Sequence, residues 1–135
     1  MKPINWIYIL IFTVFVNSCK EEQSRPDDAL GTARAFIRAS LDGEYEQAKQ
    51  LMLQDSINLF ELAQLSERFN SQLSKAEKDG YKKASIIIHS FDQVSDSVVV
   101  INYSNSYKHK KMPVKVILKD GIWQVDLNYT FSGNL

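Results

Sequence analysis

Few side chains in this sequence are of the kinds that bind metals or act as nucleophiles. It has one cysteine, Cys19, and two histidines, His89 and His109, which lie far apart and show no HxxxH spacing. A zinc site needs three or four such ligands at short spacings. The five glycines are scattered, so no phosphate-binding loop is present, and no nucleophile elbow occurs. We therefore expect no metal site and no cofactor, with His89 on a sheet face and His109 in a solvated turn.

Cys19 is placed for attachment rather than for catalysis. Lys2 is followed by an apolar run over residues 4–16, and a polar, charged stretch begins directly after Cys19. The run is shorter than the roughly 20 residues of a membrane-spanning helix but has the length of a signal-peptide core. Residues 1–19 therefore resemble a bacterial lipoprotein signal peptide, in which a small residue precedes a cysteine that receives the lipid. The resemblance implies cleavage before Cys19 and attachment of diacylglycerol and palmitate to it.

This resemblance divides the chain into residues 1–18 as signal peptide, residues 19–26 as lipidated cysteine and polar tether, and residues 27–130 as one domain. The alternative is a short uncleaved anchor with an incidental cysteine. The residues after Cys19, Lys20-Glu21-Glu22, are similar to the export signal of surface lipoproteins in the Bacteroidota group, although a solvated tether has the same composition. We expect a cell-envelope protein at the outer membrane, with exposure on the cell surface as an open alternative.

The charge balance argues against nucleic acid as a partner. The sequence has 16 basic and 16 acidic side chains, and Lys2 is the only charged one before Cys19, so one basic charge is lost on cleavage. Binding to a phosphate backbone needs a basic surface. One basic cluster does occur, at residues 107–111 with Lys82 and Lys83 nearby in sequence. It suits an anionic partner or membrane head group, or it is a charged turn that discourages edge pairing.

The first half of the chain has the apolar spacing of helices. A first helix is predicted to begin near Pro26, with Ser24 as its cap, and to stop at Gly43. A second is predicted from Glu44 to about residue 53. A third pattern runs from residue 57 towards residue 79, with a kink or break at Asn70-Ser71.

From Tyr81 onwards β-branched and aromatic residues dominate. Short turns separate four predicted strands, which indicates an antiparallel meander, and Asp120-Gly121 is the strongest hairpin signal. One face of the sheet is expected to pack on the helices and the other to meet water. The predicted strands cover residues 84–91, 97–107, 112–119 and 122–129, with Trp123, Val125, Leu127 and Tyr129 on one face of the last.

Helices followed by a meander indicate an α+β domain, with two to three helices packed on a curved antiparallel sheet of about four strands. The step Gly43-Glu44-Tyr45-Glu46-Gln47-Ala48 and the closing hairpin Lys119 to Asp126 (KDGIWQVD) are similar to small exported lipoprotein domains of unknown function with the nuclear-transport-factor-2-like fold. The resemblance covers roughly residues 27–129. It rests on a turn and on core residues, and it implies a cone-like sheet rather than an activity.

Enzymes of that fold, such as ketosteroid isomerase-like proteins, use Asp, Tyr or His side chains that point into the cone. Asp126 lies on the opposite face from Trp123, so we expect it to be hydrated. By position and strand parity the candidate pocket-lining residues are Phe36, Tyr45, Tyr103 and Trp123. Such a pocket suits a small apolar ligand, although a filled core explains the same residues.

No reaction is readable from these features. We predict a lipid-anchored, non-catalytic binding or interaction module of the cell envelope, whose partner is a protein, a peptide or a small apolar ligand. The alternatives are a small cone-fold enzyme, isomerase- or cyclase-like, with a buried acid or Tyr, and an accessory subunit of an envelope complex. An ionisable side chain at the bottom of a water-excluding cavity would favour the enzyme.

Overall fold

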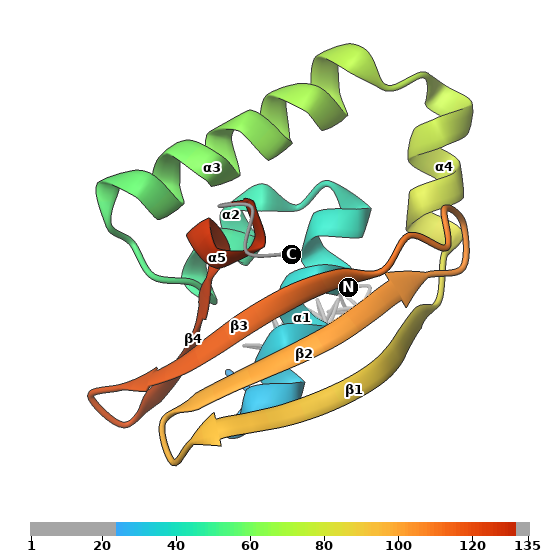
Figure 1. Ribbon diagram of the computed structural model, residues 1–135. Helices are drawn as coiled ribbons and strands as arrows, with labels where there is room; N and C mark the ends of the chain where they lie inside the picture. The colour runs from blue at the N-terminus through green and yellow to red at the C-terminus, as the bar shows by residue number, and fades with distance from the viewer. Residues whose placement is uncertain (1–23, 132–135) are drawn as a thin grey trace, which may run out of the picture.

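The structure is a computed structural model that describes residues 24–131. Its fold class is α+β, as predicted, with helices followed by a four-stranded antiparallel sheet (Figure 1). The predicted signal peptide and Cys19 lie outside the described residues. The elements are α1 (Ala29–Asp42), α2 (Tyr45–Gln50), α3 (Ser56–Glu67), the π-helical turn η1 (Arg68–Gln72), α4 (Lys75–Lys83), β1 (Ile86–Ser95), β2 (Val98–Asn105), β3 (Met112–Lys119), β4 (Ile122–Asp126) and α5 (Leu127–Phe131).

Helix α1 is the main partner of the sheet. Its N-cap is Asp28, not Ser24, because Asp28 Oδ1 accepts a hydrogen bond from the amide of Gly31 at 2.6 Å. It stops at Gly43, as predicted, where a φ of 78° requires the left-handed conformation that glycine adopts freely. The buried side of α1 contacts all four strands, and Figure 1 shows it against one face of the sheet.

The sheet is the predicted meander, with strand order β1-β2-β3-β4 and antiparallel pairing throughout. The chain after α2 covers the outer edge of β4, since Met52 forms a parallel bridge with Val125 and the amide of Leu53 donates to the carbonyl of Val125 at 2.9 Å. Strand β1 forms the other edge and is largely exposed. The core therefore lies between α1 and strands β2, β3 and β4, and its buried strand residues are Val99, Ile101, Val114, Val116 and Val125.

The third predicted helix is two helices. The interruption predicted at Asn70-Ser71 is present as η1, which follows α3 directly. A new helix, α4, then begins after Ser74, whose hydroxyl accepts from the amide of Glu77 while the Glu77 carboxylate accepts from the amide of Ser74. This reciprocal capping box starts a helix independently of the one before it. The second helix is also shorter than predicted and ends at Gln50.

The last predicted strand is wrong beyond Asp126, because the chain turns there into α5. The side chain of Asn58, from α3, explains the change: its Oδ1 accepts hydrogen bonds from the amides of Leu127 at 2.6 Å and Asn128 at 3.2 Å. These are amides that the start of a helix leaves without an intrahelical partner. The first strand is longer than predicted and reaches Ser95, so a tighter turn joins it to β2.

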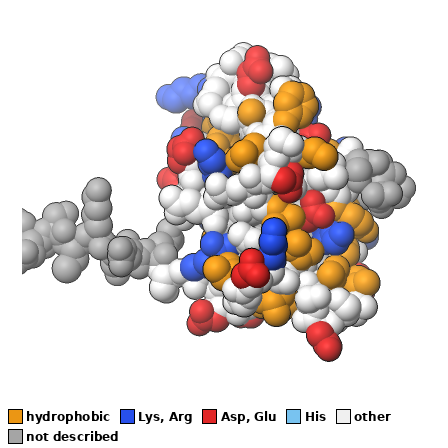
Figure 2. Space-filling model, turned by 90° about the vertical axis from the view of Figure 1, so that its left-hand side faces the viewer, with side chains coloured by type: hydrophobic (Ala, Val, Ile, Leu, Met, Phe, Trp, Pro, Cys, Tyr) orange, Lys and Arg blue, Asp and Glu red, His pale blue; other side chains and the backbone are white. Residues whose placement is uncertain are grey.

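Helix α3 lies outside the α1–sheet core and packs mainly against α2 and α5. Its outer side exposes Ile57 and Phe60. On the face shown in Figure 2, apolar side chains lie among charged side chains of both signs. None of the helices within residues 24–131 combines the length and apolar character needed to cross a membrane.

Candidate functional site

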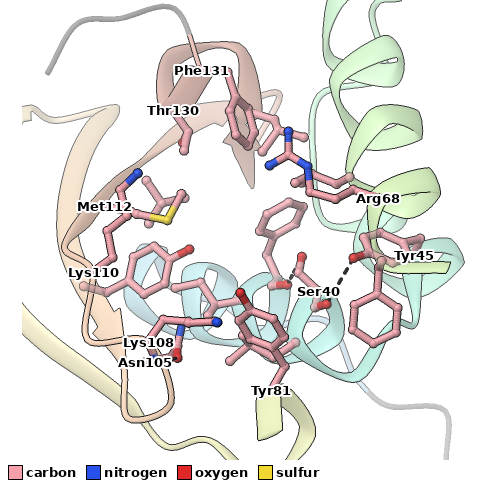
Figure 3. A pocket seen from close by; sticks show the side chains of 18 of the residues that line it. Ser40, Tyr45, Arg68, Tyr81, Asn105, Lys108, Lys110, Met112, Thr130 and Phe131 are labelled. Atoms are coloured by element: carbon pink, nitrogen blue, oxygen red, sulfur yellow. Dashed lines mark hydrogen bonds between the residues drawn. The ribbon is translucent and has the colours of Figure 1, made fainter. Parts of the chain in front are cut away.

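A cavity of about 490 Å³ opens between α1, the segment from α3 to α4, the inner strands and α5 (Figure 3). It exists because α1 packs directly on the sheet whereas α3 rests mainly on α2 and α5. Most of its lining is apolar. The aromatic residues that line it are Phe36, Tyr45, Phe69, Tyr81, Tyr103 and Phe131, and the aliphatic ones are Ile37, Leu41, Leu65, Leu73, Met112, Val114 and Leu127.

Three of the four residues predicted to line a pocket do so: Phe36, Tyr45 and Tyr103. Trp123 does not. It pairs with Leu118 near the β3–β4 turn, whereas Tyr103 pairs with Met112 at the opposite end of β3. Strand parity predicts which side of a sheet a residue faces, but not its distance along the strand from a cavity.

The two predicted tyrosines differ in their partners. The Tyr45 hydroxyl donates to the carbonyl of Ser40 at 3.3 Å, and its ring meets Phe69 edge-to-face with centroids 5.9 Å apart. The Tyr103 hydroxyl has no hydrogen-bond partner among residues 24–131. Burial raises the pKa of Tyr103 to about 12, and burial together with the phenol of Tyr81 raises the pKa of Tyr45 to about 12. Both phenols are therefore hydrogen-bond donors at neutral pH.

The charged side chains that line the cavity are all cationic: Arg68, Lys108 and Lys110. Arg68 belongs to η1, and the two lysines belong to the connection between β2 and β3. Figure 3 shows Arg68 on one side of the cavity and the lysines on the other. No Asp or Glu of the described chain is among the lining residues. The site is thus an apolar cavity with a positively charged mouth.

Asn105 fixes the connection that carries the two lysines. This residue is 8% exposed, and its Oδ1 accepts hydrogen bonds from the amides of Tyr107 at 3.1 Å and Lys108 at 2.9 Å. Its carbonyl accepts from the amide of His109 at 2.9 Å. The predicted charged turn is therefore a structured loop whose backbone is held from the sheet side.

Arg38 holds the end of α4, which supplies Tyr81 to the cavity lining. Its guanidinium donates to the carbonyls of Ala84 at 2.7 Å, Lys82 at 3.1 Å and Tyr81 at 3.2 Å, and it forms two hydrogen bonds with Asp42. These contacts attach the end of α4 to α1. Arg38 and Asn105 were not predicted from the sequence, because each acts through backbone groups that only the folded chain brings within reach.

Neither histidine is among the residues that line the cavity. Nε2 of His89 is 2.8 Å from the hydroxyl of Ser104, and His109 is exposed in the loop after β2, with a φ of 57°. Within residues 24–131 no group of three or more His, Cys, Asp or Glu side chains is arranged to hold a metal ion.

Comparison with protein-family models, curated proteins and solved structures gave no match. The function is therefore inferred from the size and chemistry of the cavity. Small-molecule sites have volumes of roughly 300–1,000 Å³ and a mostly apolar lining with a few polar groups that orient the ligand. The volume of about 490 Å³ and the lining described above have this character.

The pKa values of Tyr45 and Tyr103 predict a late ionisation in an alkaline titration. Both phenols should ionise near pH 12, above the value of about 10 that tyrosine shows in model compounds. Because their folded-state pKa values lie above the unfolded value, the stability they contribute is complete below pH 10 and is lost between pH 10 and 12. Phenolate absorbance during titration measures this late ionisation.

One variant assigns part of this late ionisation to its residue. Tyr103→Phe should remove part of the phenolate signal that develops near pH 12. Absence of a late phenolate signal in the folded protein would contradict the burial of the two phenols.

Proposed function

We propose that this chain is a lipid-anchored protein of the bacterial cell envelope whose domain binds a small, largely apolar ligand without converting it. The cavity of about 490 Å³ with its aromatic and aliphatic lining is the observation that carries the proposal. The anchor rests on the apolar segment and the Cys19 that ends it. A relationship to nuclear-transport-factor-2-like domains is part of the same proposal, and the order of helices and strands supports it.

The chemistry of the cavity favours binding over acid–base catalysis. An isomerase or cyclase of the cone-fold class needs a group that exchanges a proton near neutral pH. Among the described residues that line the cavity there is no carboxylate and no histidine. The pKa values of Tyr45 and Tyr103 are raised to about 12, so neither phenol serves readily as a base. The catalytic alternative then depends on a tyrosine acting as a donor.

Filling the cavity should abolish binding. Met112, the first residue of β3, points into the cavity in Figure 3. The indole ring that Met112→Trp introduces should therefore occupy the ligand's space. We expect the uncharged apolar dye Nile red to bind the full chain saturably, with a blue-shifted emission. The variant should bind the dye about tenfold more weakly or worse, which is a loss of about 1.4 kcal/mol or more in binding free energy.

The matched control for this substitution is Leu118→Trp, which places the same side chain on the same strand at a residue that is 36% exposed and outside the cavity. It should leave Nile red binding unchanged. Failure of the dye to bind, or equal binding by both variants, would refute the proposed cavity function.

The anchor has its own test. Cys19→Ala removes the thiol that takes the lipid, so we expect the protein to move from the membrane fraction to the soluble fraction. Stable anchoring by acyl chains depends on about 0.8 kcal/mol for each buried CH₂. Ser18→Ala, which keeps a small residue before the cysteine, is the control and should remain in the membrane. Retention of Cys19→Ala in the membrane would instead support the uncleaved anchor.

A further inference from the structure

The charged side chains at the mouth of the cavity are all cationic. Arg68 and Lys110 are exposed residues that line it, and within residues 24–131 neither side chain forms a hydrogen bond or an ion pair. Lys108, the third cation, lies over the ring of Tyr107 with its Nζ 4.8 Å from the centroid. Isolated cations around an apolar opening attract anions and focus their approach. The charges are thus free to meet a ligand from outside the chain.

One carboxylate lies near this group but is already engaged. Glu77 accepts hydrogen bonds from the amide of Ser74 at 2.9 Å and from its hydroxyl at 3.0 Å. These bonds, with a smaller contribution from the charge of Lys108, hold the pKa of Glu77 below its usual range. Glu77 is absent from the cavity lining. It therefore offsets part of the charge of Lys108 and leaves Arg68 and Lys110 as the uncompensated pair.

The two uncompensated cations come from different parts of the fold. Arg68 begins η1, a π-helical turn, and such turns occur frequently at functional sites. Lys110 extends from the loop that Asn105 holds, on the facing side of the cavity in Figure 3. A head group between them would receive hydrogen bonds from both sides. Guanidinium and ammonium donors to an anion form hydrogen bonds about twice as strong as neutral ones.

A neutral donor lies further in. Tyr103 projects from β2 into the cavity lining, and its hydroxyl lacks a partner among residues 24–131. Among the described residues no buried side-chain oxygen lacks a partner, so this hydroxyl is open to the cavity rather than sealed in the core. An oxygen of a bound ligand would accept a hydrogen bond from it. The polar groups of the cavity are therefore suited to a ligand that accepts hydrogen bonds.

We propose that the ligand of this cavity is an anionic amphiphile, with an apolar chain or ring system among the aromatic side chains and one acidic head group between Arg68 and Lys110. This inference rests on the cavity function proposed above and adds the chemical class of its ligand. A purely apolar molecule would leave the two cations without a role in binding, and a cationic amphiphile would be repelled by them.

Displacement of Nile red from the full chain carrying Cys19→Ala tests the proposal with four probes of one chain length: decanoate, decyl phosphate, decanol and decyltrimethylammonium. We expect at least one of the two anions to bind about tenfold or more tightly than decanol, and the cation to bind weakest. A preference for the phosphate over the carboxylate supports the same proposal with a phosphate head group.

The variant Arg68→Gln/Lys110→Gln removes both charges at exposed sites. It should weaken binding of the preferred anion about 10- to 100-fold and leave the affinities for Nile red and decanol unchanged. Arg34→Gln/Lys119→Gln, at two exposed residues outside the cavity, makes the same change in net charge and should have no effect. Equal binding of decanol and the anions, or an unchanged anion affinity in the first variant, overturns the inference but leaves the cavity function intact. Absence of Nile red binding refutes the cavity function itself.

Discussion

Asn58→Leu is expected to destabilise the domain by about 2–4 kcal/mol, since a buried group that loses its hydrogen-bond partner costs about 1–3 kcal/mol. Asn58 is 2% exposed, and its Oδ1 accepts from the amides of Leu127 at 2.6 Å and Asn128 at 3.2 Å. Its Nδ2 donates to Oδ2 of Asp55 at 2.8 Å. Leucine has nearly the same size but offers no acceptor, so both amides at the start of α5 lose their partner.

Chemical denaturation monitored by circular dichroism measures this loss. The control is Asn70→Leu, which removes an exposed amide whose Nδ2 donates only to the hydroxyl of Ser66 at 3.3 Å and should change stability by less than about 0.5 kcal/mol. Equal midpoints for the two variants would mean that Asn58 does not hold α5.

The same substitution should also weaken ligand binding. Helix α5 supplies Thr130 and Phe131 to the cavity, and the Thr130 hydroxyl donates to the carbonyl of Pro113 at 2.9 Å in a buried position. If the start of α5 is released, this wall of the cavity moves. We therefore expect reduced Nile red affinity in the fraction of Asn58→Leu that remains folded.

Asn58 also shows where sequence-based prediction of this fold fails. Alternation over Trp123 and Val125 correctly predicted a strand, but the pattern continues to Leu127, where the backbone is already helical. The cause is a hydrogen bond between residues far apart in the chain. Local signals succeeded where the cause was local: Gly43 ends α1, and Asp120-Gly121, with φ values of 52° and 76°, joins β3 to β4.

The residues of the cavity, like the elements of the fold, were predicted from the sequence only where the signal was local. Helical spacing and strand parity identified Phe36, Tyr45 and Tyr103, because both depend on the period of a single element. Trp123 was placed on the correct strand but at the wrong end for the cavity. The cationic pair was not predictable as a unit, because Arg68 and Lys110 belong to segments that come together only when α3, η1 and the sheet are assembled.

Arg38→Met is expected to release α4 from the domain. Helix α4 has no buried residue of its own, so little burial of apolar surface holds it in place. Arg38 donates to three carbonyls at the C-terminal end of α4, those of Tyr81, Lys82 and Ala84. Methionine keeps the aliphatic stem but has no donor, so these carbonyls lose a cationic cap that also favours the negative end of the helix dipole.

Hydrogen exchange is the suitable measurement, because the expected opening is local. The amides of α4 should exchange about 10- to 100-fold faster in Arg38→Met, which corresponds to about 1.4–2.8 kcal/mol of local stability. The ion pair with Asp42 contributes little of this, since both side chains are about one-third exposed, at 35% and 32%. Amides of β2 and β3 should keep their protection.

Two further variants separate the roles of Arg38. Arg34→Met changes an exposed arginine of the same helix and should leave exchange unchanged. Arg38→Lys keeps the charge but lacks the planar fork that reaches several acceptors at once, so it should be intermediate. Because Tyr81 is both a partner of Arg38 and part of the lining, a released α4 should also weaken Nile red binding. Full protection of α4 in Arg38→Met would show that the helix is held by other contacts, such as the edge-to-face contact of the Tyr81 and Tyr107 rings, whose centroids are 5.1 Å apart.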